Sequence, residues 1–180
     1  MEPHMPELEL LRPDHASALL AFERENRAFF AASIPDRGDE FFSAFADRYA
    51  QLLAWQAEGT DRFHVLVGEG GEIVGRVNLV EIENGSAELG YRIAQKATGR
   101  GLASAAVRDV LDLAAREYGL ELVRAKVTAD NAASRKVLER NGFIATGSLT
   151  LNGKPATSFV LEMRSGLRGS PRAGRPPIVR

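Results

Sequence analysis

The feature of the sequence that most constrains the fold is a change of hydrophobic period at Gly99-Arg100-Gly101. Upstream of it, apolar side chains alternate with other residues at positions 87, 89, 91 and 93, which is the period of a β-strand. Downstream, apolar residues recur at positions 103, 106, 107, 110, 111 and 114, which is helical spacing. A further apolar run at residues 122–127 predicts another strand. A strand–helix–strand unit of this kind is parallel and right-handed, and it places the chain among the α/β proteins.

An antiparallel meander of three strands is expected before this unit. Its first two strands cover residues 63–67 and 73–80, and its third is the alternating run that ends at residue 93. Asn84-Gly85 between the last two strands is a strong type I′ hairpin signal, because both turn positions need a positive φ. After the unit, Asn131 caps a helix that Gly142 ends.

Two helices are expected between a first strand, residues 8–11, and the meander. Pro13 and Asp14 open the first helix, since proline suits a first helical turn and aspartate suits a cap. A loop at residues 34–38 follows, because it contains the breakers proline and glycine. An aromatic stripe from Phe41 to Trp55, at steps of three and four residues, predicts the second helix.

Two closing strands, residues 143–149 and 157–163, are expected to meet at the turn Asn152-Gly153. The predicted fold is therefore α/β, with a mixed, mostly antiparallel central sheet of six or seven strands flanked by about four helices. Residues 1–165 form this one domain. Residues 166–180 are rich in arginine and proline and predict a flexible basic tail, because such a segment buries too little apolar surface to offset its ordering entropy.

The composition excludes several classes of protein. The chain has no cysteine, which excludes a disulfide scaffold, a cysteine nucleophile and a thiolate metal site. A net charge of -1 argues against a dedicated nucleic-acid binder. No apolar run approaches the ~20 residues that cross a membrane, and the acidic start of the chain does not resemble a signal peptide. We therefore expect a cytoplasmic protein without a membrane or direct nucleic-acid partner. His4, His15 and His64 lack ligand spacing, so no metal is expected.

The turn at Gly99-Arg100-Gly101 also predicts an anion site. Its glycines let the backbone come close to a ligand, and the first turn of the following helix offers unpaired N–H groups to a phosphate. A P-loop is excluded, because Leu102-Ala103 stand where that motif needs lysine and a hydroxyl residue. Gly99, Gly101 and Ser104 match the dinucleotide fingerprint poorly. A tight turn that binds no ligand remains the alternative.

A second motif, Asn131-Ala132-Ala133-Ser134, begins a helix that ends in Gly142-Phe143. Together with the glycine turn, it resembles the GNAT superfamily of acyl-CoA-dependent N-acetyltransferases over residues 8–163. The run Leu89-Gly90-Tyr91-Arg92-Ile93 before the turn, and Glu25-Asn26-Arg27 early in the chain, resemble the branch that acetylates ribosomal-protein N-termini. One departure is Thr98, where the superfamily often has glutamine or arginine.

This resemblance implies a GNAT-type fold and the transfer of acetyl from acetyl-CoA to a primary amine, with a protein N-terminal α-amine as the preferred acceptor. Without a cysteine to take the acyl group first, direct transfer in a ternary complex is the simpler route. The alternatives are a small amine acceptor (an antibiotic, a polyamine or an amino acid), an acyl-CoA-binding module without catalysis, and a dinucleotide-dependent oxidoreductase. The resemblance is compatible with a homodimer.

The resemblance also implies the roles of individual residues. Glu88 is the expected base, with an exposed strand glutamate as the alternative, and Ser134 is expected to hydrogen-bond the leaving thiolate, with a capping serine as the alternative. Tyr91 is interpreted as core or pocket wall rather than as a general acid, and Tyr118 as packing. Asn26, Arg27, Phe30 and Lys154 are candidates for the acceptor site. The expected cofactor-binding residues are Ile93, Ala94, Thr98, Gly99, Arg100, Gly101, Leu102, Ala103, Ser104, Asn131 and Ser134.

Overall fold

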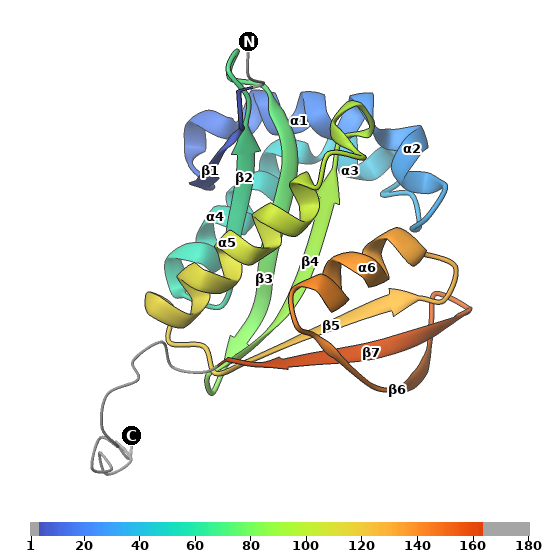
Figure 1. The fold of residues 1–180 in the computed structure, drawn as a ribbon. Coiled ribbons are helices and arrows are strands. Elements are labelled where there is room, and N and C mark those ends of the chain that lie inside the picture. The colour runs from blue at the N-terminus through green and yellow to red at the C-terminus, as the bar shows by residue number, and fades with distance from the viewer. Residues whose placement is uncertain (1–3, 164–180) are drawn as a thin grey trace.

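A computed structural model describes residues 4–163 of the 180-residue chain, and the predicted basic tail lies outside the described residues. The centre of the fold is a seven-stranded sheet in the order β1-β2-β3-β4-β5-β7-β6 (Figure 1). Its neighbouring strands run antiparallel except β4 and β5, which are parallel, so the predicted mixed sheet is confirmed. The strands are β1 (Glu7–Leu10), β2 (Arg62–Val67), β3 (Ile73–Glu83), β4 (Ser86–Ile93), β5 (Leu122–Thr128), β6 (Ile144–Leu151) and β7 (Lys154–Glu162).

Six α-helices and two short 3-10 turns lie within residues 4–163. They are α1 (Ala16–Glu25), α2 (Arg27–Ala31), α3 (Asp39–Ser43), α4 (Phe45–Glu58), α5 (Leu102–Arg116) and α6 (Ala132–Arg140), with the 3-10 turns at Pro13–His15 and Gln95–Ala97. The sequence predicts about four helices. The difference lies in the region before β2, where each of the two expected helical stretches is divided.

The single helix predicted from the aromatic stripe is two helices, α3 and α4, divided at Ala44. Ala44 leaves helical geometry, with φ −103° and ψ 20°. Phe41, Phe45 and Tyr49 are nevertheless all buried. The four-residue spacing of the apolar side chains therefore continues across the break, and for that reason the periodicity does not reveal it.

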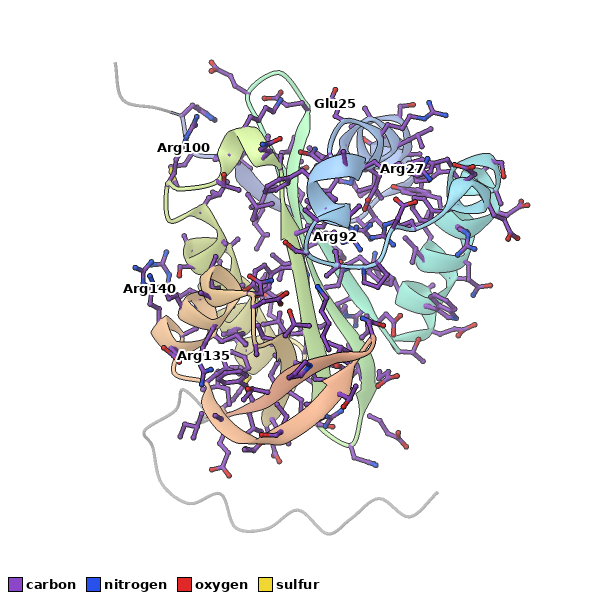
Figure 2. All side chains as sticks on the ribbon, turned by 90° about the vertical axis from the view of Figure 1, so that its right-hand side faces the viewer. Glu25, Arg27, Arg92, Arg100, Arg135 and Arg140 are labelled. Atoms are coloured by element: carbon purple, nitrogen blue, oxygen red, sulfur yellow. The ribbon has the colours of Figure 1, made fainter. Side chains whose placement is uncertain are left out.

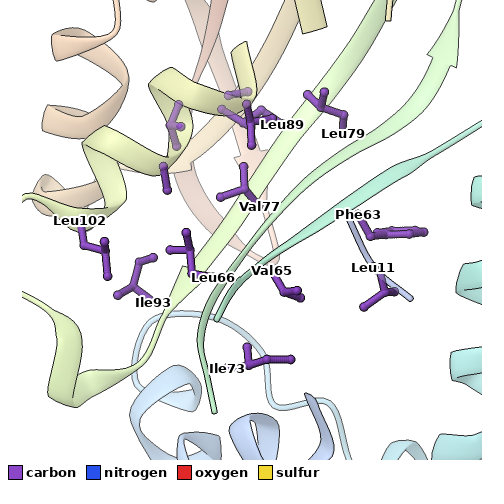
Figure 3. Packing of buried hydrophobic residues seen from close by; sticks show 14 of the residues in the cluster. Leu11, Phe63, Val65, Leu66, Ile73, Val77, Leu79, Leu89, Ile93 and Leu102 are labelled. Carbon is purple, nitrogen blue, oxygen red and sulfur yellow. The ribbon is translucent and has the colours of Figure 1, made fainter. Parts of the chain in front are cut away.

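Helices cover both faces of the sheet. α5 lies on one face, whereas α1 to α4 lie on the other, and α6 lies over β5 (Figures 1 and 2). The alternation of side chains along the central strands supplies both layers of the core. Figure 3 shows Leu66, Val77 and Ile93 on the side of α5, and Phe63 and Val65 on the opposite side. Val77 is completely buried.

The contact between β4 and β5 is unusually short. They pair only from Ser86 to Glu88 on β4 and from Leu122 to Arg124 on β5, although the strands continue to Ile93 and Thr128. Beyond these pairs the two strands diverge, whereas β5 pairs with β7 along its whole length (Figure 1). The edge of β4 is thus left open near the start of α5 and α6, where both sequence motifs lie.

Candidate active site

Two cavities lie at the opening between β4 and β5. One, of about 470 Å³, is lined by the turn before α5, the end of β4, α6 and part of α2, and we call it the loop cavity. The other, of about 540 Å³, is lined by the middle of β3 and β4, by β5, by the loop after α2 and by the β6–β7 turn, and we call it the sheet cavity. They share lining residues and therefore lie next to each other. The shared residues are Ser33, Ile34, Tyr91, Arg92, Asn131 and Ser134.

The loop cavity ends at the N-terminus of α5. Gly99 and Gly101 adopt positive φ values of 77° and 72°, and a Cβ built at either position would meet no atom within 4 Å. The turn therefore presents bare backbone to the cavity. The N–H groups of the first turn of α5 have no partner within the helix, and they carry the positive end of its dipole. Such a turn is suited to bind a phosphate group.

Two further observations at the loop cavity favour an anionic ligand. The hydroxyl of Ser104 is buried and has no hydrogen-bond partner among the described residues. Lys136 and Arg140 of α6 line the same cavity, and no acidic side chain does so in the part of the chain that the structure describes. Figure 2 shows Arg140 on the outer side of α6. With Arg92, which also lines it, the cavity combines backbone donors, a free hydroxyl and three cations, a donor set suited to a diphosphate.

All but two of the residues expected to bind the cofactor line the loop cavity. The two exceptions are Ala94 and Arg100, whose guanidinium donates to the carbonyl of Lys96 at 3.3 Å. The residues of the prediction that the structure brings together there are Ile93, Thr98, Gly99, Gly101, Leu102, Ala103, Ser104, Asn131 and Ser134.

The backbone of Ala94 is already hydrogen-bonded on both sides. Its N–H donates to the carbonyl of Val74 at 2.8 Å, and its carbonyl accepts from the N–H of Ala97 at 2.9 Å. The N–H of Ala94 is thus not available to a cofactor amide, whereas its carbonyl keeps a second lone pair. Because hydrogen bonds alternate along an antiparallel pair, the backbone groups of Tyr91 and Ile93 face away from β3, towards the gap beside β5.

A tyrosine–serine pair stands where the two cavities meet. The Tyr91 hydroxyl lies 2.5 Å from Ser134 Oγ and 3.1 Å from the Ser134 carbonyl. Asn131 Oδ1 accepts from the Ser134 N–H at 3.1 Å, which confirms the predicted cap of α6. Burial raises the pKa of Tyr91 to about 12, so its hydroxyl stays protonated at neutral pH. The interpretation of Tyr91 as pocket wall misses this bond, because 43 residues separate the partners.

Glu88, the expected base, lines neither cavity. Its Oε1 lies 3.5 Å from Lys126 Nζ, and three quarters of its side chain is covered. Glu88 and Gly90 occupy the same face of β4, since they are two residues apart on a strand. Gly90 and Lys126 both line the sheet cavity. The carboxylate therefore stands one residue pair beyond the cavity, beside Lys126, which lines it.

An arginine cluster that sequence reasoning misses forms part of the sheet cavity. Glu23 of α1 is 1% exposed. Its carboxylate contacts Arg76 at 2.7 Å, Arg37 at 3.0 Å and Arg92 at 3.5 Å. Burial raises the pKa of Glu23, but the three guanidiniums outweigh it, and the net shift is downward. Burial lowers the pKa of Arg92 to about 10, so it remains charged at neutral pH.

The four acceptor candidates lie in four different places. Phe30 lines the loop cavity and Lys154 the sheet cavity. Asn26 is buried, and its Oδ1 accepts from the Gln95 N–H at 2.9 Å, so it connects α1 to the end of β4. Arg27 lies outside both cavities and binds Asp36 and Asp39 at 2.8 Å each. Only Phe30 and Lys154 of the four therefore face the combined space.

Within residues 4–163, no three or more His, Cys, Asp or Glu side chains are grouped so as to hold a metal ion. No helix among these residues is long and apolar enough to cross a membrane. His64 is buried and bonds to the Val77 carbonyl at 3.1 Å and to the Tyr118 hydroxyl at 2.7 Å. Tyr118 thus packs as predicted and also partners a buried histidine.

Comparison with known proteins finds similarity to acetyltransferases. A family model described as an acetyltransferase (GNAT) domain matches residues 7–144. An uncharacterized N-acetyltransferase, p20 of Bacillus licheniformis, is 35% identical over 91 residues, which are 49% of this chain and 51% of that protein. The chain thus matches about half the length of this relative.

Two solved structures share the fold at low sequence identity. The ribosomal-protein-S5-alanine acetyltransferase from Vibrio fischeri superimposes with a TM-score of 0.82 at 22% identity, over 90% of this chain and 95% of that one. The spermidine N-acetyltransferase from Vibrio cholerae, solved with CoA and spermine, superimposes with a TM-score of 0.71 at 20% identity, over 87% of this chain and 94% of that one.

Proposed function

The chain belongs to the GNAT acetyltransferase family, and on that premise we propose that it transfers the acetyl group of acetyl-CoA directly to the N-terminal α-amine of a protein. One observation carries this proposal. The bare glycine turn at the start of α5 and the Tyr91–Ser134 pair line the same loop cavity. A diphosphate and a reacting group can therefore be held at the two ends of one extended ligand.

The loop cavity fits the diphosphate of CoA. The N–H groups of residues 102–104, the free hydroxyl of Ser104 and the cations Lys136 and Arg140 would hold it there. The open edge of β4 supports a place for the amides of the pantetheine arm, because an amide chain can extend a strand that has no neighbour. Ile93 and Tyr91 supply backbone groups on that edge, and Asn131 lies opposite them.

Acetyl-CoA supplies the acetyl group as a thioester. Ser134 is the proposed donor of a hydrogen bond to the departing sulfur. Tyr91 has a single hydroxyl proton, and when it donates that proton to Ser134 Oγ, the Ser134 proton is free to point into the cavity. Tyr91 would thereby position the serine hydroxyl and keep it polarised.

The acceptor must lose a proton to react. At pH 7 about one α-amine in ten is neutral, against about one lysine side chain in two thousand. An α-amine therefore needs only a weak base. Glu88, one residue pair beyond the sheet cavity, is the proposed base and would act through water, with Lys126 holding its carboxylate. The sheet cavity, at about 540 Å³, has room for more than one residue of a peptide.

A mass-spectrometric screen with acetyl-CoA tests this proposal. Peptides with free N-termini are offered beside a polyamine, an aminoglycoside and free amino acids. An acetyl mass gained at a peptide α-amine supports the proposal, and transfer to small amines alone replaces it with the small-amine alternative. Calorimetric binding of acetyl-CoA without turnover on any amine would indicate a binding module, and binding of NAD without binding of CoA an oxidoreductase.

Two variants separate catalysis from binding. In Glu88→Gln and Ser134→Ala, turnover should fall while acetyl-CoA binding measured by calorimetry is retained. If both variants turned over at the rate of the unchanged protein, Glu88 and Ser134 would have no part in the reaction, and the mechanism above would be wrong.

A further inference from the structure

The charge of the sheet cavity points to the kind of acceptor that enters it. Resting on the proposed function, we infer that the acceptor carries a carboxylate near its reactive amine, and that Arg37, Arg76 and Arg92 bind this carboxylate. The enzyme would then prefer N-terminal segments with an acidic residue to neutral or basic ones. The guanidinium cluster would recognise the substrate by an anionic group that lies beside its primary amine.

Among the described residues that line the sheet cavity, five are cationic and none is acidic: Arg37, Arg76, Arg92, Lys126 and Lys154. The two lysines have partners close by. Lys126 Nζ lies 3.5 Å from Glu88, and Lys154 Nζ lies 3.2 Å from Asp130. The excess of positive charge therefore resides on the three arginines.

Glu23 neutralises only one of these three arginines. Its two oxygens offer about four lone-pair positions, whereas three guanidiniums carry about fifteen N–H donors. Arg76 contacts Glu23 through Nη1, and Arg37 through Nε and Nη2. Most of the donors therefore remain for another acceptor. Figure 2 shows Arg92 between α2 and the sheet.

The arginines are too covered for water to compensate the excess charge fully. The side chains of Arg76, Arg92 and Arg37 are 6%, 20% and 26% exposed. Unpaired charge at such depth is unfavourable unless a counter-charge is supplied. A ligand carboxylate supplies that charge and can accept bidentate bonds from a guanidinium. A polyamine would instead add like charge to the cluster, which opposes its binding.

Asn78 gives a second, independent indication that a ligand binds in the sheet cavity. Its Oδ1 is buried without a hydrogen-bond partner among the described residues, and Asn78 lines the sheet cavity. It stands opposite Gly90, whose missing side chain leaves space above it. Arg76 is two residues away on the same face of β3, about 7 Å along the strand. The floor of the cavity thus offers an acceptor for a ligand N–H beside donors for a ligand carboxylate.

The test compares peptides that differ only in charge near the N-terminus. Three peptides share their first residue and carry aspartate, asparagine or lysine at positions two and three. The kcat/KM of the unchanged protein should be at least about tenfold higher for the aspartate peptide than for the asparagine peptide, the effect of one charge-assisted hydrogen bond, and lowest for the lysine peptide. Equal values for aspartate and asparagine peptides would overturn the inference while leaving the proposed function intact. Acetylation of none of the peptides would overturn both.

Arginine variants assign the preference to the cluster. Arg37→Gln changes the most exposed of the three arginines and should reduce the ratio of kcat/KM between the aspartate and asparagine peptides. Arg135→Gln is the matched control, because Arg135 binds Glu139 on α6 and lines neither cavity. A preference unchanged in Arg37→Gln would overturn the role of the cluster.

If Arg37→Gln does not fold, a competition experiment with the unchanged protein tests the inference. Glutarate should inhibit acetylation of the asparagine peptide competitively with peptide, whereas its diamide should not. Equal inhibition by both compounds would overturn the inference. Free glutamate, tested as a substrate, distinguishes a small carboxylate-bearing amine from an acidic peptide.

Discussion

At the scale of single residues, the Tyr91 hydroxyl is bonded to two atoms of Ser134, a residue from a different element. Tyr91→Phe keeps the buried ring but removes the hydroxyl. We expect kcat to fall about tenfold or more, because one hydrogen bond to the proposed thiolate donor is lost, while the KM for acetyl-CoA changes little. Steady-state kinetics with a peptide that the unchanged protein acetylates measure both quantities.

The double variant Tyr91→Phe with Ser134→Ala is the control for this prediction. If Tyr91 acts through Ser134, the double variant should be no slower than Ser134→Ala alone, since residues that act as a unit are not additive. Independent effects that multiply would show that Tyr91 has a separate role.

His64 makes stability depend on pH. Burial lowers the pKa of His64 from 6.5 to about 4. Between these two pH values the unfolded chain binds a proton that the folded chain does not. The free energy of unfolding therefore has its full value above pH 6.5 and falls as the pH drops towards 4. We expect a loss of about 2 kcal/mol between pH 7 and pH 5. Urea unfolding at the two pH values measures it.

His64→Gln is the matching control, because an amide can replace the bonds to Val77 and Tyr118 but does not titrate. The variant should lose much less stability between pH 7 and pH 5, whatever its stability at pH 7. An undiminished loss would assign the pH dependence to other groups.

At the scale of elements, two glycines at helix ends have similar backbone geometry, but only Gly101 lines the loop cavity, whereas Gly59 does not. Gly101 begins α5 with φ 72°, and Gly59 ends α4 with φ 82°, and a Cβ at either would meet nothing within 4 Å. Alanine at each position should cost about 1 kcal/mol, since an L-residue is strained there. Only Gly101→Ala should also raise the KM for acetyl-CoA, by roughly tenfold, because its methyl group obstructs the proposed diphosphate site.

Thermal unfolding and acetyl-CoA titration of Gly101→Ala and Gly59→Ala check this pair. Comparable stability losses with weakened binding in Gly101→Ala alone are the expected result. Equal acetyl-CoA affinity in both variants would contradict a diphosphate at the start of α5.

Local signals explain why most elements could be predicted from the sequence. Asn84 and Gly85 have φ values of 50° and 74°, and Asn152 and Gly153 have 52° and 76°, as two-residue hairpin turns require. The site is different. Glu23 meets its three arginines across separations of 14, 53 and 69 residues, so no local pattern reports the cluster. The N–H of Ala94 is likewise not free, because the pairing of β3 with β4 directs it to the carbonyl of Val74.

At the scale of the whole molecule, the divergence of β4 and β5 places the two proposed binding sites next to each other. Because the strands pair only as far as Glu88, the segment of β4 from Leu89 onward borders cavities on both sides of the Tyr91–Ser134 junction. The fold thereby separates the two ligands by position along a single strand. Residues near its middle face the proposed acceptor, and residues at its end face the proposed cofactor.

Gly90 tests this division, because it lines the sheet cavity but not the loop cavity. A Cβ at Gly90 would meet no atom within 4 Å, and its backbone needs no positive φ, so alanine and valine fit the strand without strain. Gly90→Ala and then Gly90→Val should raise the KM for the acceptor in graded steps, while the KM for acetyl-CoA and the unfolding temperature stay nearly constant. Gly147→Ala in β6, where a Cβ makes an ordinary contact, is the control and should change neither KM. A rise in the acetyl-CoA KM alone would show that the cofactor, not the acceptor, occupies the space above Gly90.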